Sequence, residues 1–430
     1  MKNLLIFTFI FTALSSFSEI WKSNNQWNTH WEKQYSKWAQ YKLNKDLFIS
    51  KRSPYYGIKA DCADSLYVIR AIFAKENRLP FAIVDPSSVR NSKKGRGAWK
   101  LIDNHIDRFD YIKNEKERFV AFANFIGLSL GTDTLKYFDT YPIAINKIKP
   151  GDIFHFNSKK KDEVIRHSVM IKKIHGTGLF DTFYSTQEIK KNNISFFNKE
   201  SKYARPLMYK LKQEFYHAPK NGSGGFRRFI WPRNLTTKFE SFKNFADYSE
   251  KQFQLAESLS KKAFFRHVKS QIASRKETLN EFIERSLQDI CQKSKERVIS
   301  VWDSVHYRKK NQNRCLNYSE FDTYSTPLRD NELKESYRNF YVGLKDRLKS
   351  VSEVPSRKWI DLAFDVIKGD STGLTKKFCS VKVTKRLKLD IADIKRKLFK
   401  GKMSSDPNQN LYARWGYTRE KSQKCRIFYN

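Results

Sequence analysis

Three apolar, β-type runs that follow one another in the middle of the chain constrain the fold most. They read "GDIFHF" (151–156), "HSVMIKKI" (167–174) and "GLFDTFYS" (178–185). The last two flank His175-Gly176-Thr177-Gly178, a sequence typical of a hairpin turn. Strands that follow one another through short turns pair antiparallel, so we expect an antiparallel sheet here.

Helical patterns precede these runs. Apolar residues at helical spacing run from Cys62 to Asn77, and "NEKERFVAFANFIGLSL" (114–130) predicts a second helix. Between them, "LPFAIV" (79–84) predicts a short strand. Helices followed by an antiparallel sheet indicate an α+β domain.

The first eighteen residues have the features of a secretory signal. Lys2 is followed by an apolar stretch from Leu4 to Leu14 and by the small residues Ser16 and Ser18. We therefore predict a signal peptide at 1–18, cleavage near Ser18 and a periplasmic or secreted protein. No later segment is apolar enough to predict a transmembrane span.

A helix with an aromatic stripe is predicted at 19–50. It should pack on the following domain, and a carbohydrate-stacking surface is the alternative. The stripe consists of Trp27, Trp31, Tyr35 and Trp38.

The Gly/Ser-rich segment 217–234, with Pro232 near its end, predicts a domain boundary near 235. The α+β domain should therefore span 51–235. Segments at three- and four-residue apolar spacing then predict a mainly α-helical basic domain at 236–430.

The charge balance favours anionic partners. The chain carries 83 Lys and Arg against 45 Asp and Glu, a net charge of +38. For an exported protein this suggests peptidoglycan or another anionic cell-envelope polymer, and no motif indicates specific nucleic-acid binding. The densest basic stretch, Thr375 to Lys402, holds eleven Lys and Arg. It is either a solvated helical face or a polyanion-docking surface, and we favour the latter.

Five cysteines are present, and four of them lie in the second half of the chain. Nearness in sequence favours the disulfides Cys291–Cys315 and Cys379–Cys425. Cys62 is left over, either as a reactive thiol or as a buried apolar side chain.

Cys62 stands where the helix over 62–77 begins, a position that lowers the pKa of a thiol. A thiol nucleophile needs a base. His167, at the head of the second β-type run, is the preferred base, and His155 is the runner-up. If the turn centres between Gly176 and Thr177, paired residues sum to 353 and Thr186 faces His167 as its orienting group.

The pieces "YYGIKADCADSLYVI", "KPGDIFHF" and "RHSVMIKKIHGTGLFDTFYST" together resemble the NlpC-type cell-wall cysteine peptidases of the papain-like superfamily, over residues 51–187. The resemblance implies a papain-like domain with Cys62 as nucleophile, His167 as base and Thr186 as the third residue. It also implies an oxyanion-binding tyrosine, Tyr55 or Tyr56. It implies hydrolysis of amide bonds in peptidoglycan stem peptides without metal or cofactor.

Asp61 and Asp64, on either side of the cysteine, are the candidate substrate-binding residues. The family's usual Asp-Cys-Ser-Gly is here Asp61-Cys62-Ala63-Asp64. A non-catalytic wall- or polyanion-binding protein on a degenerate peptidase fold is therefore an alternative. The segment after Cys62 also resembles the cysteine helix of transglutaminase-like proteins, so an acyltransferase is another.

Overall fold

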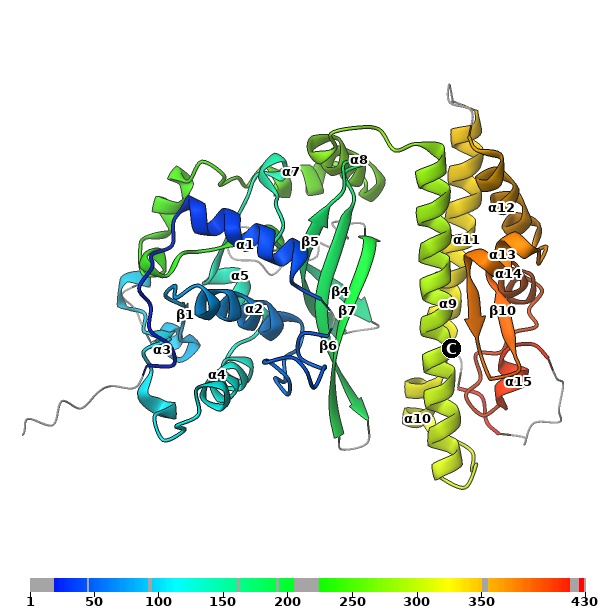
Figure 1. The fold of residues 1–430 in the computed structure, drawn as a ribbon, viewed down its shortest axis with the longest axis horizontal. Coiled ribbons are helices and arrows are strands. Elements are labelled where there is room, and N and C mark those ends of the chain that lie inside the picture. The colour runs from blue at the N-terminus through cyan, green and yellow to red at the C-terminus, as the bar shows by residue number, and fades with distance from the viewer. Residues whose placement is uncertain are drawn as a thin grey trace, which may run out of the picture. The chain divides into compact units, whose positions relative to one another are not determined.

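The structure is a computed structural model of the chain. It describes residues 19–44, 46–91, 95–160, 163–190, 193–204, 224–349, 355–417 and 425–428. The predicted signal peptide lies outside these residues. The chain divides into two compact units, residues 1–276 and 277–430 (Figure 1).

The first unit is built on a six-stranded sheet in which every neighbouring pair is antiparallel. The strands lie in the order β3-β8-β4-β5-β6-β7. Their bounds are β3 Thr140–Pro142, β8 Gly225–Phe229, β4 Ile153–Lys160, β5 Glu163–Ile174, β6 Phe180–Lys190 and β7 Asn193–Ala204. The antiparallel sheet, and with it the α+β class, is therefore confirmed.

The three predicted β-type runs form the consecutive strands β4, β5 and β6, and the predicted turn joins β5 to β6. Strand β8 was not predicted, because its sequence "GFRRF" lies within the segment 217–234 that was interpreted as a domain boundary. It pairs with β3 and β4 and so lies inside the sheet.

One face of the sheet is covered by helices from the first part of the chain. They are α1 Thr29–Tyr41, α2 Cys62–Glu76, α4 Glu115–Ser129 and α5 Thr132–Tyr137. Helix α2 packs on β5 and β6. The sheet contributes Ile153, Met170 and Phe183 to the core shared with these helices. The predicted helices over 62–77 and 114–130 correspond to α2 and α4.

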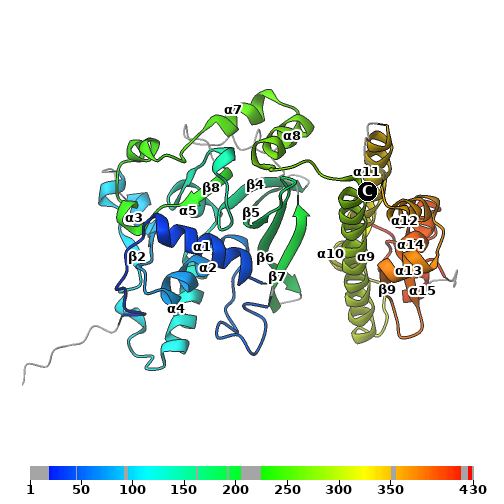
Figure 2. The ribbon, with the colours of Figure 1, turned by 45° about the horizontal axis from the view of Figure 1, so that its top comes forward.

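The opposite face of the sheet is covered by later segments (Figure 2). Here Phe154, Val169 and Phe226 from the strands pack with Phe264 and Val268 of α8, Lys261–Ile272. Helix α7, Lys251–Ser258, supplies Gln252, whose side-chain amide bonds the backbone of β8 at Phe226.

The predicted domain boundary near 235 is wrong, because the segments that follow it belong to the first unit. Residues 236–276 complete the core on the second face of the sheet, so the division falls between Lys276 and Glu277. A helical pattern shows that a segment buries one side, but it does not show what that side packs against.

The aromatic stripe of the N-terminal helix packs into the core, as predicted. Tyr35 and Trp38 of α1 contact Phe73 of α2. Glu32 of α1 binds the buried Arg70 of α2 at 2.7 Å, and the indole of Trp27 lies 3.6 Å from that guanidinium.

The remaining elements of the first unit are short. Besides short 3-10 helices, they include β1 Ala82–Val84, paired antiparallel with β2 Leu101–Asp103, and α3 Pro86–Asn91. β1 is the strand predicted from "LPFAIV".

The second unit is mainly helical, as predicted, but it also contains a two-stranded hairpin. Its long helix α9, Leu279–Lys310, packs against α11, Pro327–Leu348. The other helices are α10 Tyr318–Tyr324, α12 Arg357–Lys368, α13 Gly373–Phe378, α14 Ile391–Phe399 and α15 Leu411–Arg414. The hairpin, β9 Ser380–Lys382 and β10 Lys388–Asp390, lies inside the basic stretch 375–402, for which a helical face was the less favoured of two interpretations.

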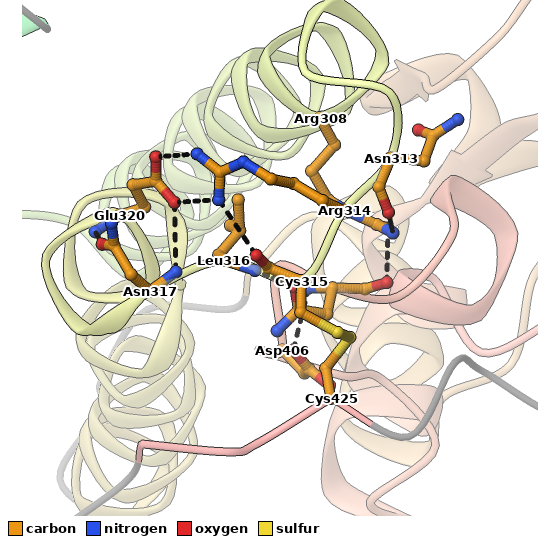
Figure 3. Close-up of a disulfide and its surroundings, with 10 residues drawn as sticks. Arg308, Asn313, Arg314, Cys315, Leu316, Asn317, Glu320, Asp406 and Cys425 are labelled. Atoms are coloured by element: carbon orange, nitrogen blue, oxygen red, sulfur yellow. Dashed lines mark hydrogen bonds and ion pairs between the residues drawn. A yellow bond between two sulfur atoms is a disulfide. The ribbon is translucent and has the colours of Figure 1, made fainter.

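Two disulfides cross-link the second unit, but not in the predicted pairing. They join Cys291 to Cys379 and Cys315 to Cys425. Figure 3 shows the latter beside Arg314, whose guanidinium binds Glu320. Nearness in sequence failed because α9 carries Cys291 away from Cys315 before the chain turns back. Among the described residues, no helix is long and apolar enough to cross a membrane.

Candidate active site around Cys62

Cys62 is the first residue of α2, and the local sequence explains why the helix begins there. Asp61 is the N-cap, and its side chain accepts a hydrogen bond from the backbone N–H of Ala63. Asp64 completes a capping box by accepting from the backbone N–H of Asp61. Both carboxylates that were predicted to bind substrate therefore hold the helix end in place.

The thiol of Cys62 is buried against the sheet. The backbone N–H of Ser168 and the side chain of Thr132, at the start of α5, hydrogen-bond it. Burial, followed by the nearby charge of Asp61, raises the pKa of Cys62 to about 11, although both hydrogen bonds act in the opposite direction. The thiol is therefore neutral at physiological pH, and the expected lowering of its pKa by the helix end is outweighed.

Strands β5 and β6 stop pairing with each other beside this thiol. The β5–β6 ladder ends at the pair Met170–Phe183, whereas β5 stays paired with β4 as far as Glu163. Strand β6 continues with β7 to Lys190 (Figure 1). Ser168 lies just beyond the end of the β5–β6 ladder. At this point the backbone N–H of β5 bonds the Cys62 thiol of α2 and not strand β6.

His155, the runner-up base, lies on the face of the sheet that carries the thiol. Its strand partner is Ser168, and its Nδ1 lies 2.8 Å from the Ser168 hydroxyl. Both residues are buried, and they continue the row begun by Ile153 and Met170, which pack with α2. Cys62, Ser168 and His155 thus form one buried cluster.

His167 is directed to the other face. Side chains alternate along a strand, so His167 shares a side with Val169 and Ile171, which belong to the core under α8. Its ring contacts Tyr184, with centroids 5.5 Å apart, and Tyr184 packs against that same core. The pairing of Cys62 with His167 does not fit this arrangement, because the two side chains lie on opposite faces.

The hairpin register agrees with the prediction at two pairs, but the β5–β6 ladder ends there, so the predicted His167–Thr186 pair is not part of it. The pairs Met170–Phe183 and Ile171–Thr182 sum to 353, and a bulge shifts the pairs nearer the turn by one. Thr186 belongs to β6, but its side chain lies outside the described part of the structure, so its proposed role as an orienting group stays a prediction.

Tyr55 is not placed to bind an oxyanion at Cys62, and the role of Tyr56 stays a prediction. The hydroxyl of Tyr55 donates to Glu76 at 2.7 Å, and Glu76 is the last residue of α2. Fifteen residues of helix separate this end from Cys62 by roughly 20 Å. Tyr56 is 45% exposed.

Sequence reasoning missed Ser168 and Thr132. Ser168 is adjacent to the predicted histidine, but no pattern distinguishes it from any strand serine. Thr132 follows Gly131 at a helix start, which is a structural signal only. Among the described residues, no group of three or more His, Cys, Asp or Glu is arranged to hold a metal ion.

Fold and site together define an α+β protein with a buried cysteine at a helix start, packed against an antiparallel sheet that carries a buried histidine. No family model, curated protein or solved structure matches the chain.

Proposed function

We propose that the first unit is a cysteine hydrolase in which Cys62 is the nucleophile and His155 the base. The cluster of Cys62, Ser168 and His155 carries this proposal. It combines the only cysteine outside the two disulfides with a buried imidazole on the same sheet face. The resemblance to NlpC-type peptidases independently gives Cys62 this role.

The raised pKa of Cys62 determines how such a reaction would proceed. Because the thiol is neutral, its proton must leave as the sulfur attacks the carbonyl carbon, and not beforehand. The imidazole takes that proton and passes it to the amine as the C–N bond breaks. Water then hydrolyses the thioester, and the acid is released. With Nδ1 of His155 bonded to Ser168, the transfer would run through Nε2.

The substrate class we propose is the amide bonds of peptidoglycan stem peptides. The net charge of +38 suits an anionic wall, and two disulfides suit a chain that works in an oxidising compartment outside the cytoplasm. Peptidoglycan or another anionic envelope polymer is accordingly the proposed partner.

The test is digestion of purified muropeptides by the full chain and three variants. Cys62→Ala and His155→Ala should lose activity by at least about 100-fold, the usual range for a general base. His167→Ala is the matched control and should stay within a few-fold of the parent. An active Cys62→Ala variant would refute the nucleophile, and an inactive His167→Ala beside an active His155→Ala would restore the pair inferred from sequence.

A non-catalytic binding protein is the second candidate, and the burial of the neutral thiol favours it. It predicts that the chain retains muropeptides on a column while no product appears. It also predicts that alkylation of Cys62 leaves this retention unchanged. Amine-dependent products would instead indicate the acyltransferase alternative with the same residues.

A further inference from the structure

A cationic hairpin in the second unit has no part in the site around Cys62. Residues 277–430 carry 33 Lys and Arg against 20 Asp and Glu, so total charge does not single this unit out. Within it, the segment 376–389 has no acidic residue. Its six cations are all exposed; they are Lys376, Lys377, Lys382, Lys385, Arg386 and Lys388.

Two of these cations face each other across the hairpin. Lys382 of β9 and Lys388 of β10 are directly paired, and both are exposed on the same side. Like charges in this position destabilise a strand pair, whereas a Lys–Glu pair would stabilise it. The hairpin therefore keeps an arrangement that its own folding does not favour.

The buried side of the hairpin compensates for this repulsion and fixes its position. Val381, Val383 and Leu389 are buried in the core of the unit. Cys379, directly before β9, is bonded to Cys291 of α9, and the indole N–H of Trp302 donates to the carbonyl of Val383 at 2.7 Å. The cations thus stand on a rigid platform, which lowers the entropy lost on binding.

The tip of the hairpin is equally well defined. The backbone N–H groups of Arg386 and Leu387 both donate to the hydroxyl of Thr384, and Val383 N–H donates to the carbonyl of Leu387. Lys385 and Arg386 therefore project from a closed turn next to the Lys382–Lys388 pair.

Nearby carboxylates are already engaged. Asp390 is buried and caps α14, and Asp393 binds Arg396. Among the ion pairs of the described residues, none involves a cation of the segment 376–389. Asp393 also attracts Lys376, which belongs to α13. The cations of the hairpin itself are exposed and available to an external anion; they are Lys382, Lys385, Arg386 and Lys388.

We infer that the β9–β10 hairpin is a docking surface for a linear, phosphate-bearing polymer. Three of the hairpin's four cations are lysines, which bind phosphate as point charges without a fixed geometry. Residues 380–390 contain no aromatic side chain, so the stacking platform that single-stranded nucleic acids use is missing from these strands. This surface would act whether or not Cys62 is a nucleophile.

Binding of the full chain to linear inorganic polyphosphate, measured against salt concentration, tests the inference. The variant Lys382→Gln/Lys388→Gln should bind roughly tenfold more weakly at low salt, and the slope of log K against log salt should fall by about 1.4, or 0.7 for each lost contact. The control Lys309→Gln/Lys345→Gln removes two exposed lysines from α9 and α11 and should match the parent. Equal losses in both variants would show only general attraction and overturn the inference.

A single charge-reversal variant, Lys388→Glu, distinguishes an effect on polyphosphate binding from an effect on folding. It should weaken polyphosphate binding while raising the thermal midpoint of the second unit, because it creates a favourable cross-strand pair. A midpoint that falls together with binding would assign these lysines a structural role and contradict the inference. Tighter binding of single-stranded DNA than of polyphosphate of equal charge would contradict the polymer class, as would a hairpin-dependent preference for anionic lipid vesicles.

Discussion

The imidazole Nδ1 of His155 lies 2.8 Å from the hydroxyl oxygen of Ser168, and this pair faces α2 while the adjacent His167 faces the opposite core. The difference is one of strand parity. Both histidines belong to strands of the same hairpin, but only one of each pair of neighbouring residues can point toward Cys62. A shift of one residue in the β4–β5 register would place both histidines on the same face of the sheet.

The first prediction concerns the thiol itself. Burial and the charge of Asp61 hold the pKa of Cys62 near 11, so alkylation by iodoacetamide should rise with pH well beyond the ordinary range of thiols. Asp61→Asn keeps a capping side chain but removes the larger of the two repulsive charges, and should lower this pKa. Asp64→Asn removes the weaker of the two repulsive interactions and should lower the pKa of Cys62 less than Asp61→Asn does.

The labelling rate is followed on Cys62 alone, because the other four cysteines form disulfides. A titration centred at or below about 8.5, the value of a free thiol, would show that burial does not control this group.

A second prediction concerns the pH dependence of stability. Burial, followed by repulsion from Asp61, raises the pKa of Asp64 to about 8, against about 3.9 in an unfolded chain. Between these values the folded state holds a proton that the unfolded state has released. Stability should therefore fall as pH rises from about 4 to 8, by up to about 1.4 kcal/mol per pH unit, and level off above.

Asp64→Asn should reduce this dependence, measured by urea unfolding followed by tryptophan fluorescence, because most tryptophans lie in the first unit. The buried Asp139, whose pKa burial raises to about 7, keeps its own contribution. Glu115→Gln removes one exposed carboxylate on α4 and serves as the control. If the two variants show the same pH profile, Asp64 is not the group responsible.

A third prediction tests whether the N-terminal helix is part of the first unit. Glu32 and Arg70 form a buried pair, and Trp231 donates a further hydrogen bond to Glu32. Glu32→Leu leaves a buried guanidinium uncompensated, which costs about 3–5 kcal/mol. Amide exchange over residues 29–41 should accelerate strongly.

The double variant Glu32→Leu/Arg70→Met removes both charges and should recover most of the protection. Glu335→Gln breaks the exposed pair with Arg338 and should change exchange little. Unchanged exchange in Glu32→Leu would mean that α1 is held by its aromatic contacts alone.

The features that sequence predicted are those set by local patterns. Clear helical periodicity marked Cys62–Glu76, which forms α2. Clear β-type runs marked the strands β4, β5 and β6, with a recognisable turn between the last two. Strand β8 was missed because its place depends on partners more than sixty residues away. The boundary was misplaced because helical periodicity in residues 251–272 does not reveal that these helices cover a sheet.

The candidate site shows the same limit. Sequence placed Cys62 at the helix start, and the structure has this feature. It did not show that the strand face shared by His167, Val169 and Ile171 lies in the core on the side of the sheet away from α2. Which face of the sheet packs against α2 is decided by tertiary packing, and no pattern in the sequence indicated it. Tyr55 was a candidate because of the resemblance to NlpC-type peptidases, but its hydroxyl bonds Glu76 at the far end of α2.

The last prediction concerns the disulfides of the second unit. The cysteines of Cys291–Cys379 and Cys315–Cys425 are 88 and 110 residues apart, so each bond restricts the unfolded chain over a long loop. Loop-closure entropy predicts that replacing either pair by serine costs about 4–5 kcal/mol. The loss should appear as a lower denaturation midpoint of the second unit, with amide exchange of the first unit unchanged. Peptide mapping without reduction reports the pairing directly: a Cys291–Cys315 peptide would contradict the structure and return the pairing to the one expected from nearness in sequence.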